Sequence, residues 1–176
     1  NVPVLGVRQV WTAKIAPVQD LPLAMQVQGT QLTLASADGM VAALDARTGG
    51  DVWRTNLGTA LSAGVGSDGR WSAVVSRDNE LIVLESGREA WRKGLGFQVF
   101  TAPLVAGARV FVLGSDRSVS AFDAKNGAKL WSQTRPGDPL VLRQQGVLVA
   151  QGDTLVVGES GRLVGMNPDT GTVRWE

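Results

Sequence analysis

The chain consists of short runs in which apolar and polar residues alternate, separated by turns rich in glycine, aspartate and asparagine. A period of two over four to eight residues is typical of β-strands that bury one face. No segment of ten or more residues shows the apolar spacing of an amphipathic helix. The pattern therefore predicts an all-β protein.

Residues 121–131 illustrate the unit that the chain repeats, and they indicate a hairpin. An apolar run ends at Asp123, Asn126 and Gly127 supply a turn, and Trp131 lies in the next apolar run. Glycine is expected because a tight turn with a bulge requires a positive φ. The tryptophan is large enough to cover the end of one sheet and pack against the next.

This unit occurs four times, and in every copy the tryptophan lies four positions after the glycine. Successive turn glycines are 38, 40 and 44 residues apart, which is a period typical of propeller blades. We therefore expect eight residues to be structural blade anchors. They are Gly49 with Trp53, Gly87 with Trp91, Gly127 with Trp131, and Gly171 with Trp175.

The repeats predict a β-propeller of four-stranded antiparallel blades, as one portion covering residues 1–176. The blades are expected at about residues 21–58, 59–95, 96–135 and 136–176, each with its first strand innermost. The expected strands are residues 23–27, 31–36, 40–45 and 51–57; 61–65, 71–76, 80–85 and 89–93; 103–106, 110–114, 118–123 and 129–134; and 147–150, 154–158, 162–167 and from 173 onward.

Residues 7–15 stand outside these blades. They contain Trp11, which lies 42 residues before Trp53, or one repeat earlier. We predict an orphan outer strand whose partners lie elsewhere, because the N-terminal strand of a closed propeller commonly completes the last blade. Four blades with such a strand favour half of an eight-bladed propeller over a complete four-bladed one. A homodimer of half-propellers is an alternative, with this strand pairing with the fourth blade of another copy.

Composition removes many functions. The 17 basic and 16 acidic residues leave a formal charge of +1, so the net charge does not favour binding to nucleic acid or to an anionic membrane surface. Without histidine or cysteine, the chain cannot form a Ser-His-Asp site, a thiol redox centre or the usual zinc sites. The aspartates fall in turns, where their side chains bond the local backbone. We therefore expect no catalytic residues, no metal site and no cofactor.

The turn sequence, Asp-x-x-Thr-Gly-x-x-x-Trp at residues 45–53 with variants of it in the other three copies, resembles quinoprotein-type propeller repeats, which occur in quinone-dependent dehydrogenases and in noncatalytic scaffolds. Over residues 7–176 the chain resembles about the first half of the BamB family, eight-bladed lipoproteins of the bacterial outer-membrane assembly machine. The resemblance implies a scaffold at the periplasmic face of the outer membrane, held there only by a lipid anchor outside this sequence. It also implies two partners, the periplasmic domains of BamA and unfolded outer-membrane proteins.

The segment Leu140-Val141-Leu142-Arg143 resembles the Leu-x-Leu-Arg segment in the long loop of the family's fourth blade. Because that loop helps contact BamA, the resemblance makes Leu140, Leu142 and Arg143 the candidate partner-binding residues. Two leucines beside an arginine also have the composition of an interface anchor. On the residues alone, the leucines could instead pack onto their own blade.

Two other functional classes remain open. A fragment of a quinone-dependent dehydrogenase would hold a quinone and calcium in the central channel, which requires converging carboxylates. A generic propeller binding module would take a different partner.

Overall fold

The computed structural model describes residues 6–16, 24–134, 145–159 and 161–176. These residues form four antiparallel sheets of four strands each, which confirms the predicted propeller blades. None of the described residues lies in a helix, so no helix among them is long and apolar enough to cross a membrane.

Each sheet is a meander in which neighbouring strands follow the chain order. The first sheet contains β1 (Gln26–Gln28), β2 (Gln31–Ala35), β3 (Met40–Asp45) and β4 (Asp51–Asn56). The second contains β5 (Leu61–Ser67), β6 (Trp71–Ser76), β7 (Glu80–Glu85) and β8 (Arg88–Gly94). The third contains β9 (Leu104–Ala106), β10 (Arg109–Leu113), β11 (Ser118–Asp123) and β12 (Lys129–Thr134). The fourth contains β13 (Val147–Gln151), β14 (Thr154–Glu159), β15 (Arg162–Met166) and β16 (Val173–Trp175).

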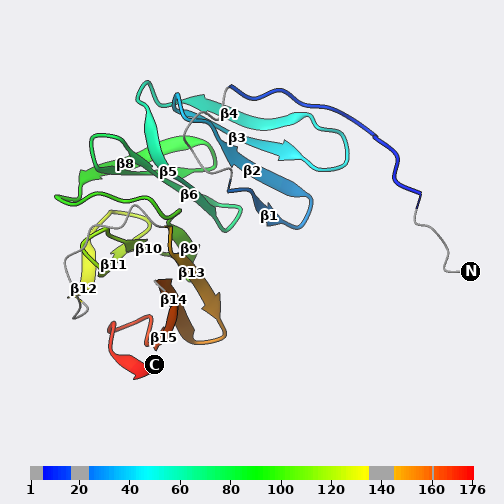
Figure 1. Ribbon diagram of the computed structural model, residues 1–176. Helices are drawn as coiled ribbons and strands as arrows, with labels where there is room; N and C mark the ends of the chain where they lie inside the picture. Colours follow the sequence, from blue (N-terminus) through cyan, green and yellow to red (C-terminus); the bar gives the residue numbers. More distant parts are fainter. Residues whose placement is uncertain (1–5, 17–23, 135–144, 160) are drawn as a thin grey trace, which may run out of the picture.

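The four sheets follow one another along an arc (Figure 1). The first strands of the sheets face the concave side, and the fourth strands lie toward the outside. This is the radial order expected for blades of a propeller. It brings residues from four distant parts of the chain to one concave surface.

The core lies between successive sheets rather than inside one of them. The two middle strands of the second and third sheets are covered on both faces, and every residue of β6 is buried. Val74 and Ile82 of the second sheet pack toward Val41 of the first. On its other face, Val83 packs with Val110 and the neighbouring apolar residues of the third sheet. Burial on both faces explains why these strands are apolar at almost every position.

Residues 7–15 form no strand with any described residue, and the outer strand predicted for them, with partners elsewhere, stays a prediction. A strand needs a neighbour that completes its backbone hydrogen bonds, and the sheet nearest this segment already has its four strands. The segment is held instead by a side chain, Trp11, whose indole nitrogen donates to the carbonyl of Ala46 at 2.8 Å.

Candidate functional site

The repeated turn is built by the residues that the sequence singles out. The Asp45 carboxylate accepts a 2.8 Å hydrogen bond from the backbone N–H of Arg47. Asp123 accepts one of the same length from Lys125. The turn glycines have φ values of 71°, 83°, 72° and 74°, and the strand pairing shifts register just before each turn. The carboxylate and the positive φ together produce a bulged turn.

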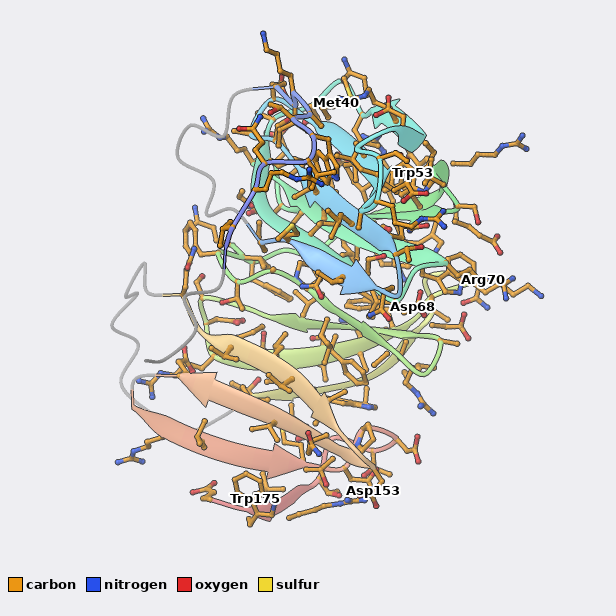
Figure 2. All side chains as sticks on the ribbon, turned by 90° about the vertical axis from the view of Figure 1, so that its right-hand side faces the viewer. Met40, Trp53, Asp68, Arg70, Asp153 and Trp175 are labelled. Carbon is orange, nitrogen blue, oxygen red and sulfur yellow. The ribbon has the colours of Figure 1, made fainter. Side chains whose placement is uncertain are left out.

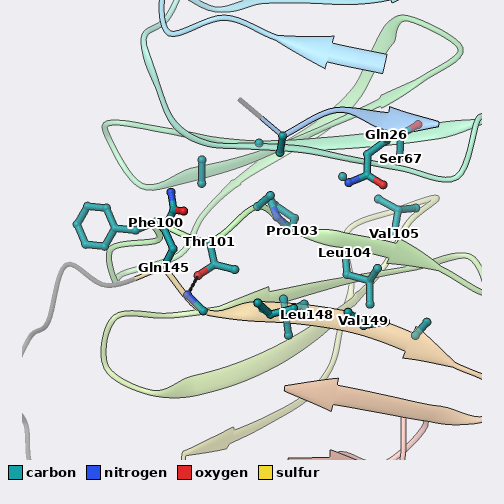
Figure 3. A pocket seen from close by; sticks show the side chains of 18 of the residues that line it. Gln26, Ser67, Phe100, Thr101, Pro103, Leu104, Val105, Gln145, Leu148 and Val149 are labelled. Atoms are coloured by element: carbon teal, nitrogen blue, oxygen red, sulfur yellow. Dashed lines mark hydrogen bonds between the residues drawn. The ribbon is translucent and has the colours of Figure 1, made fainter. Parts of the chain in front are cut away.

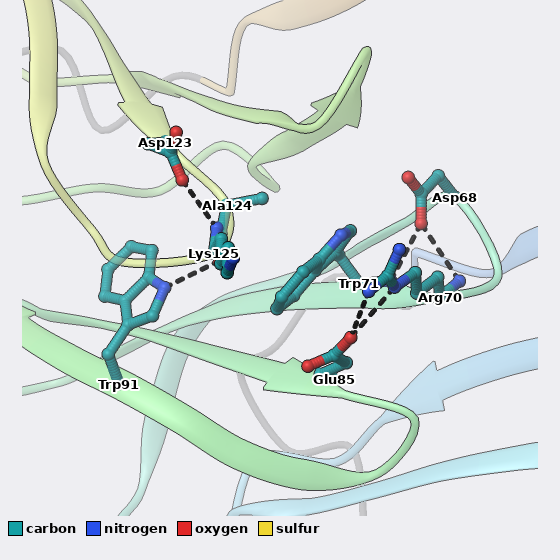
Figure 4. A network of polar contacts seen from close by, with 8 residues as sticks. All are labelled: Asp68, Arg70, Trp71, Glu85, Trp91, Asp123, Ala124 and Lys125. Atoms are coloured by element: carbon teal, nitrogen blue, oxygen red, sulfur yellow. Dashed lines mark hydrogen bonds and ion pairs between the residues drawn. The ribbon is translucent and has the colours of Figure 1, made fainter.

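Each of these turns receives a tryptophan from the preceding part of the chain. A Cβ added to Gly127 would lie 2.8 Å from the Trp91 ring, so only glycine leaves room for it. The indole nitrogen of Trp91 also donates to the carbonyl of Ala124 at 2.7 Å (Figure 4). We call the turn glycine and the carbonyl three residues before it the tryptophan slot. The same glycine contact joins Trp11 to Gly49, Trp53 to Gly87 and Trp131 to Gly171.

The first and last tryptophans of the series differ from the others. Trp11 fills the slot of the first sheet, although it belongs to no described sheet. Trp175 lies over Gly165 of its own sheet, keeps 46% of its surface exposed and donates to no acceptor among the described residues. Among the described residues each slot is therefore filled, and of the five tryptophans spaced by the repeat only Trp175 has no slot.

A groove of about 550 Å³ runs along the concave side (Figure 3). All four sheets contribute to it through their first strands and the residues just before them. Its polar groups include Gln26, Ser67, Thr101 and Gln145, whereas Val149 is among the apolar ones. None of the described lining residues carries an ionisable side chain. These described residues can offer hydrogen bonds and apolar contacts, but they supply no carboxylate for acid–base chemistry or cation binding.

The three predicted partner-binding residues, Leu140, Leu142 and Arg143, fall in residues 135–144, outside the described part of the chain. The chain resumes at one end of the groove, where the backbone N–H of Gly146 donates to the Thr101 hydroxyl at 2.9 Å (Figure 3). Thr101 is buried, and a Cβ on Gly146 would lie 2.7 Å from the carbonyl oxygen of Gly158. This contact fixes where the chain re-enters the fourth sheet. The sequence around Thr101 shows no motif that predicts this hydrogen bond.

The described carboxyl groups are absent from the groove lining, and several of them pair with arginine side chains. Hydrogen bonds from the side chain and backbone of Arg47 lower the pKa of Asp45 to about 2. Hydrogen bonds from arginine side chains also lower the pKa values of Asp51, Glu89 and Asp153. A general acid at neutral pH requires the opposite shift. Among the described residues, no group of three or more acidic, histidine or cysteine side chains could hold a metal ion.

A profile of the family described as "Outer membrane protein assembly factor BamB" matches residues 37–176 of this chain. Two curated proteins of that name cover 99% of the chain. The one from Bordetella pertussis is 35% identical over 176 residues, and the one from Burkholderia pseudomallei is 37% identical over 177 residues. The chain spans 46% of the length of each of these relatives.

The fold is also similar to solved structures. The crystal structure of BamB from Moraxella catarrhalis aligns with a TM-score of 0.73 and 23% identity, covering 89% of this chain and 48% of that one. The quinohemoprotein alcohol dehydrogenase from Comamonas testosteroni aligns with a TM-score of 0.70 and 18% identity, covering 94% of this chain and 36% of that one. At these identities the alignments show a common propeller fold.

Proposed function

Because the chain belongs to the family of the outer membrane protein assembly factor BamB, we propose that it is a noncatalytic scaffold of the machinery that assembles outer-membrane β-barrels. It corresponds in this proposal to the N-terminal half of such a scaffold. The protein works at the periplasmic face of the outer membrane, anchored by a lipid outside this sequence. The observation that carries the proposal is the family match, which covers residues 37–176.

The groove supports a binding role over catalysis. A quinone-dependent dehydrogenase needs carboxylates near a calcium ion and its quinone, and hard cations such as calcium bind through oxygen ligands. The described groove residues include amides, hydroxyls and apolar groups without a carboxylate. The alcohol dehydrogenase has a similar fold, but at 18% identity this similarity gives no support for a shared activity.

We expect added pyrroloquinoline quinone and calcium to give no stoichiometric complex with this chain. Absorbance titration followed by gel filtration would detect a retained chromophore, and a quinone dehydrogenase would serve as the positive control. A saturating one-to-one complex would contradict the scaffold proposal and favour a dehydrogenase fragment.

The partner in this proposal is the periplasmic part of BamA, and unfolded outer-membrane proteins are the cargo. Leu140 and Leu142 provide apolar anchors, while the Arg143 guanidinium pairs with an acidic or carbonyl group of BamA. The Thr101–Gly146 hydrogen bond supports this assignment, since it ties the chain just after these residues to the rim of the groove.

Arg143→Glu is expected to weaken the association with BamA by about 2–4 kcal/mol, the range of a hot-spot residue. The reversed charge removes the guanidinium contact and adds repulsion where a carboxylate faces it. The melting temperature should hardly change if the residue lies outside the sheets' core. Titration of the BamA periplasmic domains with a chain carrying the complete propeller would measure the first effect, and calorimetry the second.

Lys125→Glu is the matched control because it makes the same charge change at an exposed turn position. Its backbone N–H, which bonds Asp123, is retained. Equal affinity of the wild type and both variants would rule out residues 140–143 as the BamA contact. A large loss of stability in Arg143→Glu would assign that residue a structural role instead.

A further inference from the structure

A pocket of about 150 Å³ lies between the third and fourth sheets, beside the turns that join their first and second strands. Apolar groups form most of its wall, among them Phe111, Leu155 and Pro168. Arg109 carries the one ionisable side chain among the described lining residues. The wall belongs to the faces that these two sheets pack against each other, and it shares only Ala150 with the concave groove.

The repeat shows which residues correspond to Arg109 in the preceding sheets. Strand pairing places Arg109 opposite Asp123, where the turn of the tryptophan slot begins. It places Trp71 opposite Glu85 in the second sheet, and Gln31 opposite the corresponding aspartate in the first. Gln31 reaches the next sheet, because its side-chain nitrogen donates to a carbonyl of the β5–β6 turn at 3.4 Å. These three residues therefore hold one position of the repeat.

In the second sheet, this position is filled by an aromatic ring. Trp71 is 4% exposed and lies with Ala124 in the apolar cluster between the second and third sheets (Figure 4). Ala124 corresponds to Pro168 in the pocket wall, since the carbonyl of each accepts the hydrogen bond of a tryptophan in its slot. The space that the Trp71 ring fills between those two sheets is thus open between the next two, where Arg109 takes its position.

The Arg109 guanidinium favours an aromatic ring over an aliphatic group as the occupant. A guanidinium can stack on the face of a ring. The second sheet has such a contact, with the Arg70 guanidinium 5.2 Å from the centroid of the Trp71 ring. A 2.6 Å ion pair with Asp169 holds the Arg109 guanidinium against the turn of the fourth sheet that lines the pocket.

Size and charge specify an uncharged phenyl ring. A cavity of about 150 Å³ with apolar walls holds a ring of the size of benzene. The described charges beside the pocket are already paired, Arg109 with Asp169 and Arg174 with Asp153 at 3.0 Å. Asp153 lies on the same side of the stacked sheets as Arg70 (Figure 2). A free amino acid would bring two charges that need partners of their own, whereas a phenylalanine within a polypeptide brings none.

We propose that this pocket binds the phenylalanine side chain of an unfolded or extended polypeptide segment, with the Arg109 guanidinium stacked on the ring. The bound ring takes the place that the Trp71 ring of the chain itself takes one sheet earlier. The site goes beyond the scaffold role, and it depends neither on BamA nor on residues 140–143.

N-acetyl-phenylalanine amide is the probe for this site, and N-acetyl-leucine amide is its aliphatic control. Amide NMR spectra of the whole chain should show saturable shifts for Gly107, Gly152 and the indole N–H of Trp131, which donates to the Pro168 carbonyl in the pocket wall. The indole N–H of Trp91, in the slot of the third sheet, should stay unchanged. We expect the phenylalanine probe to bind about fivefold more tightly than the leucine probe. Equal affinities, or no shift of these groups, would overturn the proposal.

Two substitutions of Arg109 locate the ring. Arg109→Lys keeps the positive charge beside Asp169 but removes the planar guanidinium, so it should weaken the phenylalanine probe about fivefold and leave the leucine probe unchanged. Arg109→Trp fills the pocket with a ring of the chain's own, as Trp71 does in the preceding sheet, and should abolish binding of both probes. Arg92→Lys is the matched control, because it makes the same change on β8, where the arginine pairs with Glu89.

The outcomes of these titrations separate the parts of the proposal. Phenylalanine binding that is unchanged in Arg109→Lys would show that the guanidinium does not contact the ring. Unchanged binding by a folded Arg109→Trp protein would place the ring outside this pocket, and the lysine variant keeps the test valid if the tryptophan variant fails to fold. Free phenylalanine that binds more tightly than its blocked form would overturn the polypeptide as the occupant.

Discussion

Trp131→Ala is expected to lower the free energy of unfolding by about 3–5 kcal/mol, as truncations of large buried aromatic residues do. The ring lies between the third and fourth sheets, 6.0 Å from the Phe111 ring between centroids, and rests on Gly171. Its indole nitrogen donates to the Pro168 carbonyl at 2.9 Å. The substitution therefore opens a cavity and also leaves a carbonyl without its donor. Urea denaturation followed by circular dichroism would measure the loss.

Trp175→Ala provides the internal control for this prediction. It occupies the same position of the repeat and makes the same change in size, but its ring is 46% exposed and lacks a slot. We expect a loss of about 1 kcal/mol or less in the monomeric protein. Similar losses in both variants would show that the tryptophan acts within its own sheet and that docking onto the next turn contributes little.

The sequence predicts the sheets closely where alternation and turn residues agree. Residues 71–76, 80–85, 118–123 and 129–134 were expected as strands and are strands at those limits. Between these strands, residues such as Asp78, Asn79 and Gly127 favour turns over strands. At β5 the prediction ends at Val65, whereas the strand continues to Ser67. Two glycines, Gly64 and Gly66, weaken the alternation there, and only the neighbouring sheet shows why they are tolerated.

The functional surfaces were harder to predict because they join distant residues. The groove combines residues from Ala24 to Ala150, and the lack of ionisable side chains among its described residues appears only once the first strands lie side by side. The hydrogen bond between Gly146 and Thr101 joins the segment before β13 to the segment before β9, and neither residue type predicts it. The sequence also places Trp11 one repeat before Trp53 without indicating which turn receives it. Leu140, Leu142 and Arg143 remain predictions, since they lie outside the described residues.

Gly66 of β5 lies against Pro103, the residue just before β9 of the third sheet. A Cβ at this position would clash with the Pro103 carbonyl oxygen and lie 2.7 Å from its carbonyl carbon. The obstacle is backbone, so no change of rotamer can relieve it. The φ of Gly66 lies outside the left-handed region, and the effect of a substitution there is therefore steric.

Gly66→Val is expected to cost about 3–5 kcal/mol, the upper end of overpacking effects, because β5 must move away from the segment leading into β9. Gly94→Val makes the same change in β8, where nothing lies within 4 Å of an added Cβ and the φ is also ordinary. There we expect a change within about 1 kcal/mol, on the stabilising side, because valine restricts the unfolded chain and favours a strand. Paired urea denaturation curves of the two variants would measure the difference. A Gly66→Val protein as stable as Gly94→Val would mean that the inner strands are farther apart than described, and the groove between them would then be wider.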